Sequence, residues 1–295
     1  MLNLAPAEGS LSTVKRQSEL VVVARRLAKN PSAVVGFIVA LSLTLMAIFA
    51  PLIAPYPYDK QDLYNTRAAP SAEHIFGTDE LGRDIFSRIV YGSRFSLSIG
   101  FLAVLFSSSI GMVLGAIAGY FGGIVDDIIM RLIDLIQSIP GILLAITISV
   151  VLGPGFFNTL LALGFGMITM ACRLTRAAVL GVRHQEYLEA ATSINASTPR
   201  IILRHIIPNS FAPVLVSATM SIGNVIMAAA MLSFIGLGVQ PPMPEWGSMI
   251  AGGRSLIRSC PWMVTFPGIF IMLAVLALNL FGDGLRDALD PKLKK

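Results

Sequence analysis

The chain has 295 residues, of which 55% are hydrophobic and 13% charged, and its formal net charge at pH 7 is +5. Soluble domains usually carry about 25% charged residues, whereas several stretches here approach or exceed the roughly 18 apolar residues that cross a bilayer. The composition excludes an ordinary soluble protein and predicts a multispanning membrane protein, whose small positive charge fits basic loops and does not require nucleic acid.

The first 30 residues are polar and basic, and residues 19–29 are predicted to form an amphipathic helix on the membrane surface. A secretory signal is the alternative, but the following apolar run, residues 33–53, is longer than a signal core and further spans follow it. Residues 33–53 are therefore predicted to be the first transmembrane helix, with its N-terminus inside.

Residues 54–94 form a polar segment with four side chains that often bind metals. Their spacing matches no strong ligand pattern, so the segment is predicted to be a solvated turn and helix with no metal site. The four side chains are His74, Asp79, Glu80 and Asp84.

The second span is predicted at residues 95–120, where Gly111, Gly115 and Gly119 recur every four residues. Glycines at this spacing share one helix face and let another helix backbone approach closely, so we expect them to serve helix packing. Charged and apolar residues then alternate over 126–136, which is typical of a helix at the membrane boundary.

The remaining spans are predicted at residues 141–152, 157–178, 211–232 and 264–281. Arg173 and Arg176 lie near the inner end of the fourth, where long cationic side chains can reach the headgroups. A loop with many helix breakers and an interfacial Trp246 precedes the last span. Two cysteines, Cys172 and Cys260, fall in different layers, so no disulfide is expected between them.

Residues 183–209 are a polar hairpin between the fourth and fifth spans. A helix is expected from Glu186 to residue 194, and Asn195 tolerates the left-handed conformation that ends helices. A second helix is predicted to begin with Thr198 as its cap and Pro199 at its first position. Pro208 either closes this helix or forms a hinge into the next span.

The distribution of basic residues predicts the orientation. With the N-terminus inside, 15 of the 22 Lys and Arg residues lie in inner segments and 7 in outer ones. The positive-inside rule favours this arrangement, which places the hairpin in the cytoplasm. A simple connection could be much shorter, so the hairpin is expected to have a function of its own.

The chain contains no Gly-rich phosphate-binding loop, no His-Glu-x-x-His motif, no paired-Cys metal site and no Gly-x-Ser-x-Gly motif. No enzymatic site is therefore predicted. The predicted spans contain no charged side chain besides Arg173 and Arg176, which disfavours a stand-alone carrier driven by an ion gradient. The energy for transport is then expected from a cytoplasmic partner.

Four motifs in order resemble the permeases of ABC importers, in their dipeptide, oligopeptide and nickel branch. Glu189-Ala190-Ala191 followed by Ile206-Ile207-Pro208 resembles the Glu-Ala-Ala loop of these permeases. The similarity extends from about residue 31 onward, and within the branch the chain resembles the second of two homologous permease subunits. The other three motifs are FGTDELGRD (76–84), LGVQPP (237–242) and DGLRDALDP (283–291).

The resemblance implies an all-α type I (MetI-like) permease with six transmembrane helices and a cytoplasmic coupling helix. It also implies a heterodimer with the homologous permease, two cytoplasmic ATPases that bind the ATP and Mg²⁺, and an external binding protein. The family usually has Gly where this chain has Asn195, and we expect the turn to survive the difference. The residues assigned to coupling are Glu186, Tyr187, Glu189, Ala190, Ala191, Asn195, Pro199, Arg200 and Pro208.

On this basis the chain divides into a cytoplasmic segment (1–30), a first span with an outer segment (31–94), a permease core (95–282) and a cytoplasmic tail (283–295). The predicted function is import of short peptides across the cytoplasmic membrane of a bacterium or archaeon. Nickel or a metal chelate, and glutathione, are the alternative cargoes. Five methionines, which could suggest a soft-metal path, are better explained as flexible packing residues: Met167, Met170, Met220, Met227 and Met231.

Overall fold

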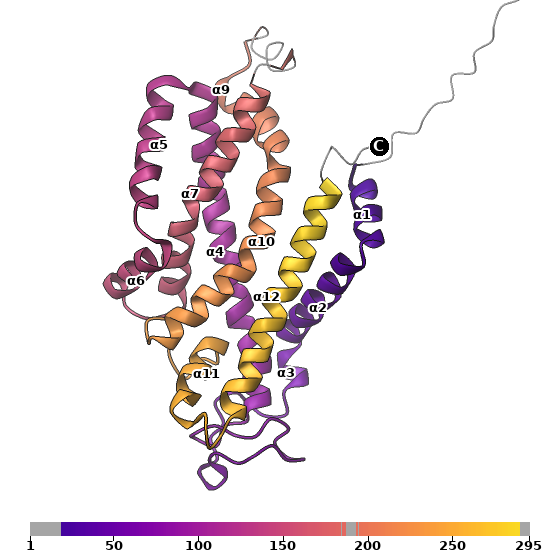
Figure 1. Cartoon of the computed structure of the whole chain (residues 1–295), viewed down its shortest axis with the longest axis vertical. Helices are drawn as coiled ribbons and strands as arrows, with labels where there is room; N and C mark the ends of the chain where they lie inside the picture. Colours follow the sequence, from indigo (N-terminus) through magenta and orange to yellow (C-terminus); the bar gives the residue numbers. More distant parts are fainter. Residues whose placement is uncertain (1–18, 184, 187–192, 194, 290–295) are drawn as a thin grey trace, which may run out of the picture.

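The computed structural model describes residues 19–183, 185–186, 193 and 195–289. In these residues the chain is helical, and its only β-type pairing is an isolated bridge between Thr78 and Asp84. Long helices lie side by side along one axis (Figure 1). Five helices are long and apolar enough to cross a membrane, and a bent helix pair would make a sixth span. The predicted all-α, multispanning fold class is confirmed.

The N-terminal helices α1 (Glu19–Lys29), α2 (Pro31–Ile48) and α3 (Ala50–Ile53) follow one another with short breaks. Asn30 caps α2, because its side chain accepts hydrogen bonds from the backbone N–H groups of Ser32 and Ala33. Arg26 in α1 donates to the carbonyl oxygen of Ala288 at 3.3 Å. The helical N- and C-terminal ends therefore lie together, on the side of the molecule towards α9 (Figure 1).

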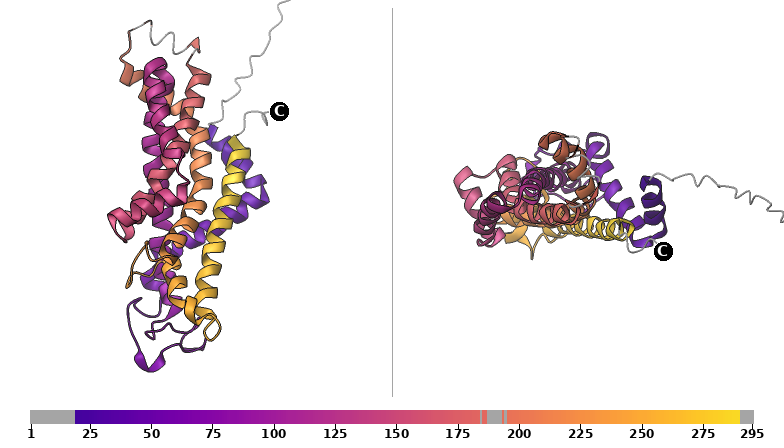
Figure 2. Two further views of the ribbon diagram at one scale, coloured as in Figure 1. Left: turned by 60° about the vertical axis from the view of Figure 1, so that its left-hand side comes forward. Right: turned by 90° about the horizontal axis from the view of Figure 1, so that it is seen from above.

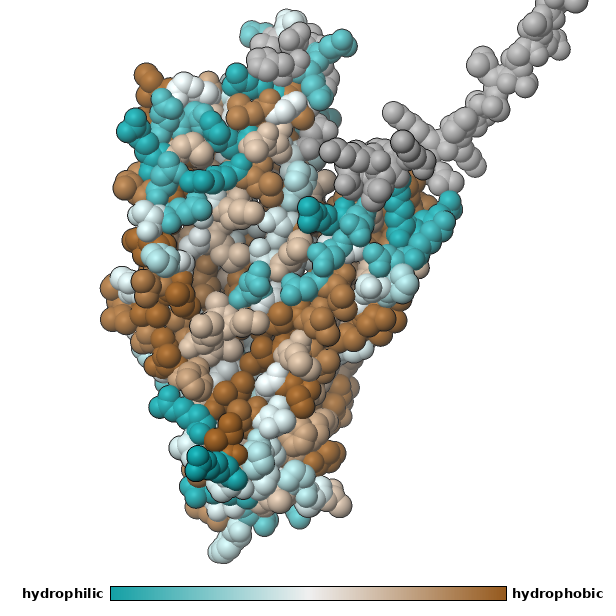
Figure 3. Space-filling model, viewed as in Figure 1, coloured by the Kyte–Doolittle hydropathy of each residue, from teal (hydrophilic) through white to brown (hydrophobic). Residues whose placement is uncertain are grey.

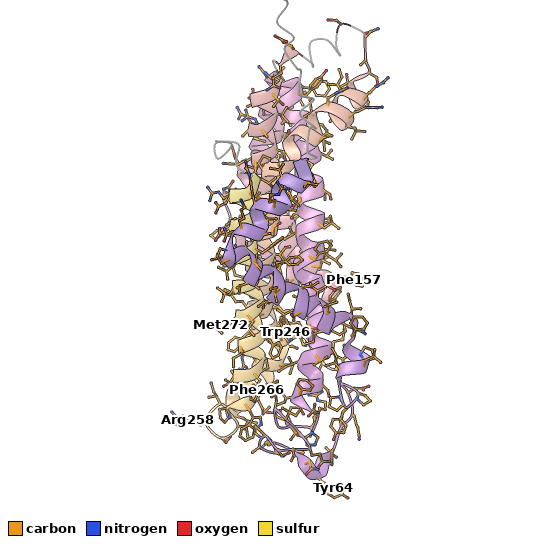
Figure 4. The ribbon with its side chains drawn as sticks, turned by 90° about the vertical axis from the view of Figure 1, so that its right-hand side faces the viewer. Tyr64, Phe157, Trp246, Arg258, Phe266 and Met272 are labelled. Carbon is orange, nitrogen blue, oxygen red and sulfur yellow. The ribbon has the colours of Figure 1, made fainter. Side chains whose placement is uncertain are left out.

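Residues 54–84 form a folded segment at the opposite end, with the short helix η1 (Leu63–Asn65) and Tyr64 at its tip (Figure 4). The segment is largely exposed, as predicted, but three of its four candidate metal-binding side chains, His74, Asp79 and Asp84, are buried and only Glu80 is exposed. Each buried polar group has a partner, which offsets the cost of removing it from water. Near the tip, hydrogen bonds from the Asn65 side chain and the Tyr64 backbone hold the pKa of Asp62 below its ordinary value.

Two hydrogen-bonded clusters hold this segment in place. His74 Nδ1 lies 3.0 Å from Asp84 Oδ1, while Asp84 also caps the next helix by accepting from the N–H of Ser87 at 2.7 Å. Asp79 accepts from the Nε of Arg83 at 2.7 Å and lies 3.5 Å from that of Arg88. Phe76 stacks on Phe266 with the ring centroids 4.0 Å apart, which attaches the segment to the last helix.

Helix α4 (Ile85–Phe121) has 37 residues and begins ten residues before the predicted start at 95. Asp84 caps it there, and the polar residues of its first turns are satisfied inside the protein. Arg94, for example, donates to the carbonyl oxygens of Ala47 and Ile48 at the end of α2. At about 1.5 Å per residue α4 is roughly 55 Å long, so it extends well beyond a hydrocarbon core of about 30 Å.

Helices α5 (Gly123–Gln137) and α6 (Gly141–Leu152) are bent by 85° at their junction. The predicted third span, 141–152, is wrong as an independent span, because 12 residues rise only about 18 Å. Helix α5 runs alongside α7 (Phe156–Val182) (Figure 1). Seen from above, α5 and α6 lie at one end of a flattened bundle and α1 and α2 at the other (Figure 2).

The C-terminal half consists of α9 (Thr198–Ile201), the π-helical turn η2 (Ile202–Ile206), α10 (Ile207–Phe234), α11 (Trp246–Gly253), η3 (Arg254–Leu256) and α12 (Trp262–Leu289). Trp246, predicted to be interfacial, is fully buried, and its Nε1 donates to the carbonyl oxygen of Ile89 at 3.0 Å. Glu245 is also buried and caps α11. The final span reaches Leu289, so the predicted polar tail is helical over most of its length.

Helices α4 and α10 contribute to both larger hydrophobic cores. One core joins them to α6 and α7, and the other joins them to α2, α11 and α12. On the visible face, hydrophobic residues dominate the middle of the molecule, and hydrophilic ones gather near the hairpin end, around α1 and at the opposite end (Figure 3). This distribution is the one expected of a bundle that crosses a bilayer. Cys172 and Cys260 are buried and unpaired.

Candidate functional site: the hairpin and its support

The hairpin is carried by α7 and α10, and α7 lies directly against α4. A Cβ atom on Gly115 would be 2.3 Å from the carbonyl oxygen of Cys172, and one on Gly111 would be 2.8 Å from that of Ile168. At Gly119 the obstacle is Val179 Cβ, also at 2.8 Å. Any side chain at these positions would collide with α7, so the glycines allow the two backbones to come together.

Ion pairs connect α7 to α5. Arg176 forms a two-pronged pair with Asp126, and Arg173 pairs with Asp134. The expectation that these arginines reach for the headgroups is wrong, since both guanidinium groups are turned towards carboxylates of α5. Because paired guanidinium and carboxylate groups fit each other's planar geometry, the contacts fix the position of α7 relative to α5.

The base of the hairpin is apolar. Ile201 and Ile206 are buried against Ala116 of α4 and Val179 of α7. Asn195 has a φ of 56°, the left-handed conformation predicted for it, and its side chain is exposed. The hairpin is therefore anchored to the helices at one end of α9 and turns sharply at the other.

Pro208 does not close the second helix, because helical backbone continues through it from the turn η2 into α10. Before Pro208, the N–H of Ile207 bonds to the carbonyl oxygen of Ile202, a π-helical step. A proline ring clashes with the carbonyl four residues earlier in a regular helix, and the wider turn relieves that clash. Pro199 is the second residue of α9, with Ser197 rather than Thr198 at the cap position.

One face of the described hairpin is open to solvent. Pro199, Arg200, Leu203 and Arg204 are exposed, with Leu203 at 64%, whereas Ile201 and Ile206 on the other side are buried. The exposed face therefore combines two guanidinium groups, of Arg200 and Arg204, with the apolar side chain of Leu203. Such a surface offers hydrogen-bond donors and an apolar contact to an acidic or carbonyl-rich partner.

The structure places only part of the predicted coupling set. Glu186 is exposed, as are Asn195, Pro199, Arg200 and Pro208. Tyr187, Glu189, Ala190 and Ala191 lie outside the described residues. Sequence reasoning missed Leu203, although a large apolar residue beside two arginines in a polar hairpin was a usable signal. Among the described residues, no group of three or more His, Cys, Asp or Glu side chains could hold a metal ion.

Comparison with known proteins identifies the family. The model of the binding-protein-dependent transport system inner membrane component matches residues 111–295, and that of the N-terminal domain of oligopeptide transport permease C matches residues 18–70. The chain belongs to this transport family. The resemblance found in its motifs is thereby confirmed, and the chain is a multi-pass inner membrane permease of an ABC importer, a kind of system that includes ATPase and binding-protein partners.

Relatives of this permease are similar over most of its length. It is 49% identical to the dipeptide transport system permease protein DppC of Alkalihalophilus pseudofirmus, over 92% of this chain and 89% of that protein. It is 42% identical to the oligopeptide permease OppC of Bacillus subtilis, over 92% of this chain and 88% of that protein. The glutathione permease GsiD of Escherichia coli is 45% identical, over 92% of this chain and 89% of that protein.

A solved structure shares the fold. A chain of the MetNI methionine ABC transporter in an inward-facing conformation superposes with a TM-score of 0.55, at 18% identity, over 69% of this chain and 97% of that one. The permease fold predicted from the motifs is therefore confirmed.

Proposed function

We propose that this permease moves short peptides into the cell. The observation that carries the proposal is its 49% identity to a dipeptide permease over 92% of the chain. A glutathione permease at 45% identity favours glutathione as the second candidate, which has the same chemistry because glutathione is itself a tripeptide. Nickel or a metal chelate remains the alternative from a different class.

We further propose that the hairpin receives the mechanical input of an ATPase. In this account the termini and the hairpin are cytoplasmic, and residues 54–84 face the binding protein. A homologous permease completes the pore, and two ATPases bind the hairpins of the two permeases. The exposed Arg200, Leu203 and Arg204 support the proposal as a surface for a partner, and the buried Ile201 and Ile206 support it as a rigid connection to α4 and α7.

The test is uptake of a labelled dipeptide by the complete transporter in lipid vesicles, with ATP supplied on the hairpin side. Wild-type protein should accumulate the peptide only with ATP and the binding protein present. In a transporter that carries Glu189→Lys, the ATPase subunits should continue to hydrolyse ATP while peptide uptake falls at least about tenfold, because a reversed charge disrupts docking. Unchanged uptake by this variant would exclude a coupling role, and uptake of a nickel chelate but no peptide would reassign the cargo.

A further inference from the structure

Asn224 carries a polar group that nothing in the described structure satisfies. It lies near the middle of the apolar stretch 210–234 of α10, its side chain is exposed, and it makes no hydrogen bond to any described residue. Most serines and threonines of the spans behave differently: Thr219 in the same helix, for example, donates to the carbonyl oxygen of Leu215 at 2.8 Å. A carboxamide cannot be satisfied in this way by its own helix turn as readily as a hydroxyl can.

Such a group is costly in hydrocarbon. Moving an amide from water to an apolar medium without a hydrogen bond is strongly unfavourable. Asparagine near the middle of a span is therefore expected to face water, a cargo or another polypeptide, and not lipid tails.

Two serines extend the polar surface along the same side of α10. Ser217 and Ser221 precede Asn224 at intervals of four and three residues, which places all three on one helix face. Ser221 Oγ donates to the carbonyl oxygen of Ser217 at 2.8 Å, which leaves its lone pairs available to accept. Seven residues of helix rise about 10 Å, the length of about three residues of extended peptide.

Cavities adjoin this strip at both ends. The cavity towards the C-terminal end of α12 has a volume of ≈ 760 Å³ and is lined by Ser217, Met220 and Ser221 together with Met170 of α7 and Arg286 of α12. A second cavity of ≈ 240 Å³ is lined by Asn224 with Gly141, Gly166 and Met167. Apart from Arg286 at the wide end, the lining is neutral and rich in methionine, a side chain that adapts to differently shaped ligands.

We propose that Asn224, Ser217 and Ser221 form a cargo site in the transport path that binds the peptide main chain. The carboxamide can donate to a peptide carbonyl and accept from a peptide N–H, and the hydroxyls add further acceptors. Neutral groups on a methionine-lined wall bind backbone amides without selecting particular side chains. The inference rests on the proposed peptide cargo and adds the residues that contact it.

The experiment compares two peptides in vesicles that contain the complete transporter and saturating binding protein. Trialanine and trialanine methylated on its central amide nitrogen differ by one hydrogen-bond donor. Asn224→Leu should lower trialanine uptake about tenfold, the effect of one lost hydrogen bond, and should lower the preference for trialanine over the methylated peptide. Asn224→Gln should restore part of the trialanine uptake and part of the preference. Thr219→Val is the matched control, because its hydroxyl is already bonded within α10, and it should change neither.

The outcomes separate this inference from the function on which it rests. Normal trialanine uptake and an unchanged preference in Asn224→Leu would overturn the cargo site while leaving peptide transport intact. Failure of Asn224→Leu to co-elute with the partner permease would overturn it too, by assigning the carboxamide to the subunit interface. If wild-type protein imported neither peptide, the proposed function would fail and the inference with it.

Discussion

Gly115 is the residue at which α4 and α7 approach most closely among the three glycines of the α4 face. A Cβ atom there would be 2.3 Å from a backbone oxygen, which cannot move without shifting the helix. The sequence was sufficient to predict a packing face here, because the four-residue interval depends only on helix geometry. It did not reveal that the partner would be α7, since this depends on the assembled bundle.

Gly115→Ala should therefore lower the stability of the purified protein by about 1–3 kcal/mol, the usual cost of forcing an extra group into a packed interface. The measurement is the thermal transition in detergent. Gly268→Ala is the control, because no atom lies within 4 Å of a Cβ at that position of α12. It should be neutral or slightly stabilising. Equal losses in both variants would contradict the account.

Single buried polar residues were harder to predict. His74, Asp79 and Asp84 were expected in a solvated segment, and Glu245 was not singled out, yet all four are buried. A polar side chain in a sequence gives no sign of a partner that lies far along the chain. The link from Glu245 to Ser96 of α4, for instance, spans 149 residues. Only the folded arrangement shows that these groups are satisfied.

At the scale of elements, the segment 54–84 is organised by Asp84. This residue caps α4 through the N–H of Ser87 and also contacts His74. Its removal should therefore free the segment from the start of α4.

Asp84→Ala should destabilise the protein by about 2–4 kcal/mol, because it removes a helix cap and leaves a buried histidine without its partner. It should also expose residues 54–84 to limited proteolysis. Glu80→Ala serves as the control, since Glu80 belongs to the same segment but is exposed. A segment equally resistant to protease in both variants would show that Asp84 does not hold it.

The contact between α5 and α7 was also not predicted. The charges of residues 126–136 were taken as contacts with the membrane boundary, because their carboxylates had no visible partner in the sequence. The structure supplies Arg176 for Asp126, 50 residues away. The 85° bend between α5 and α6 was not predicted either.

A double-mutant cycle on Asp126→Ala and Arg176→Ala should yield a coupling energy of about 0.5–3 kcal/mol, as expected for residues in direct contact. The same cycle with Asp127→Ala in place of Asp126→Ala should yield little coupling, because Asp127 is exposed and no hydrogen bond or ion pair is seen for it in the described structure. Thermal unfolding of the four proteins in each cycle provides the energies. Equal coupling in the two cycles would argue against the pair.

At the scale of the whole molecule, Tyr64 and the hairpin mark opposite ends of the bundle (Figures 1 and 4). The sequence predicted the helical class and five of the six spans, because hydropathy and helix breakers determine them locally. Orientation rests on the count of basic residues. Since both native cysteines are buried, single introduced cysteines can report it with low background.

A membrane-impermeant maleimide added to intact cells whose outer barrier is open should label Tyr64→Cys, whose native side chain is fully exposed. Arg200→Cys should react only after the cytoplasmic membrane is permeabilised. The reverse pattern would invert the proposed topology.

Cross-linking tests whether an ATPase docks on the hairpin. Photoreactive groups attached to Arg200→Cys and to Tyr64→Cys would be activated in the assembled transporter. We expect a cross-link between position 200 and the ATPase that changes with bound nucleotide, and none from position 64. An ATPase cross-link from position 64, or none from position 200, would contradict it.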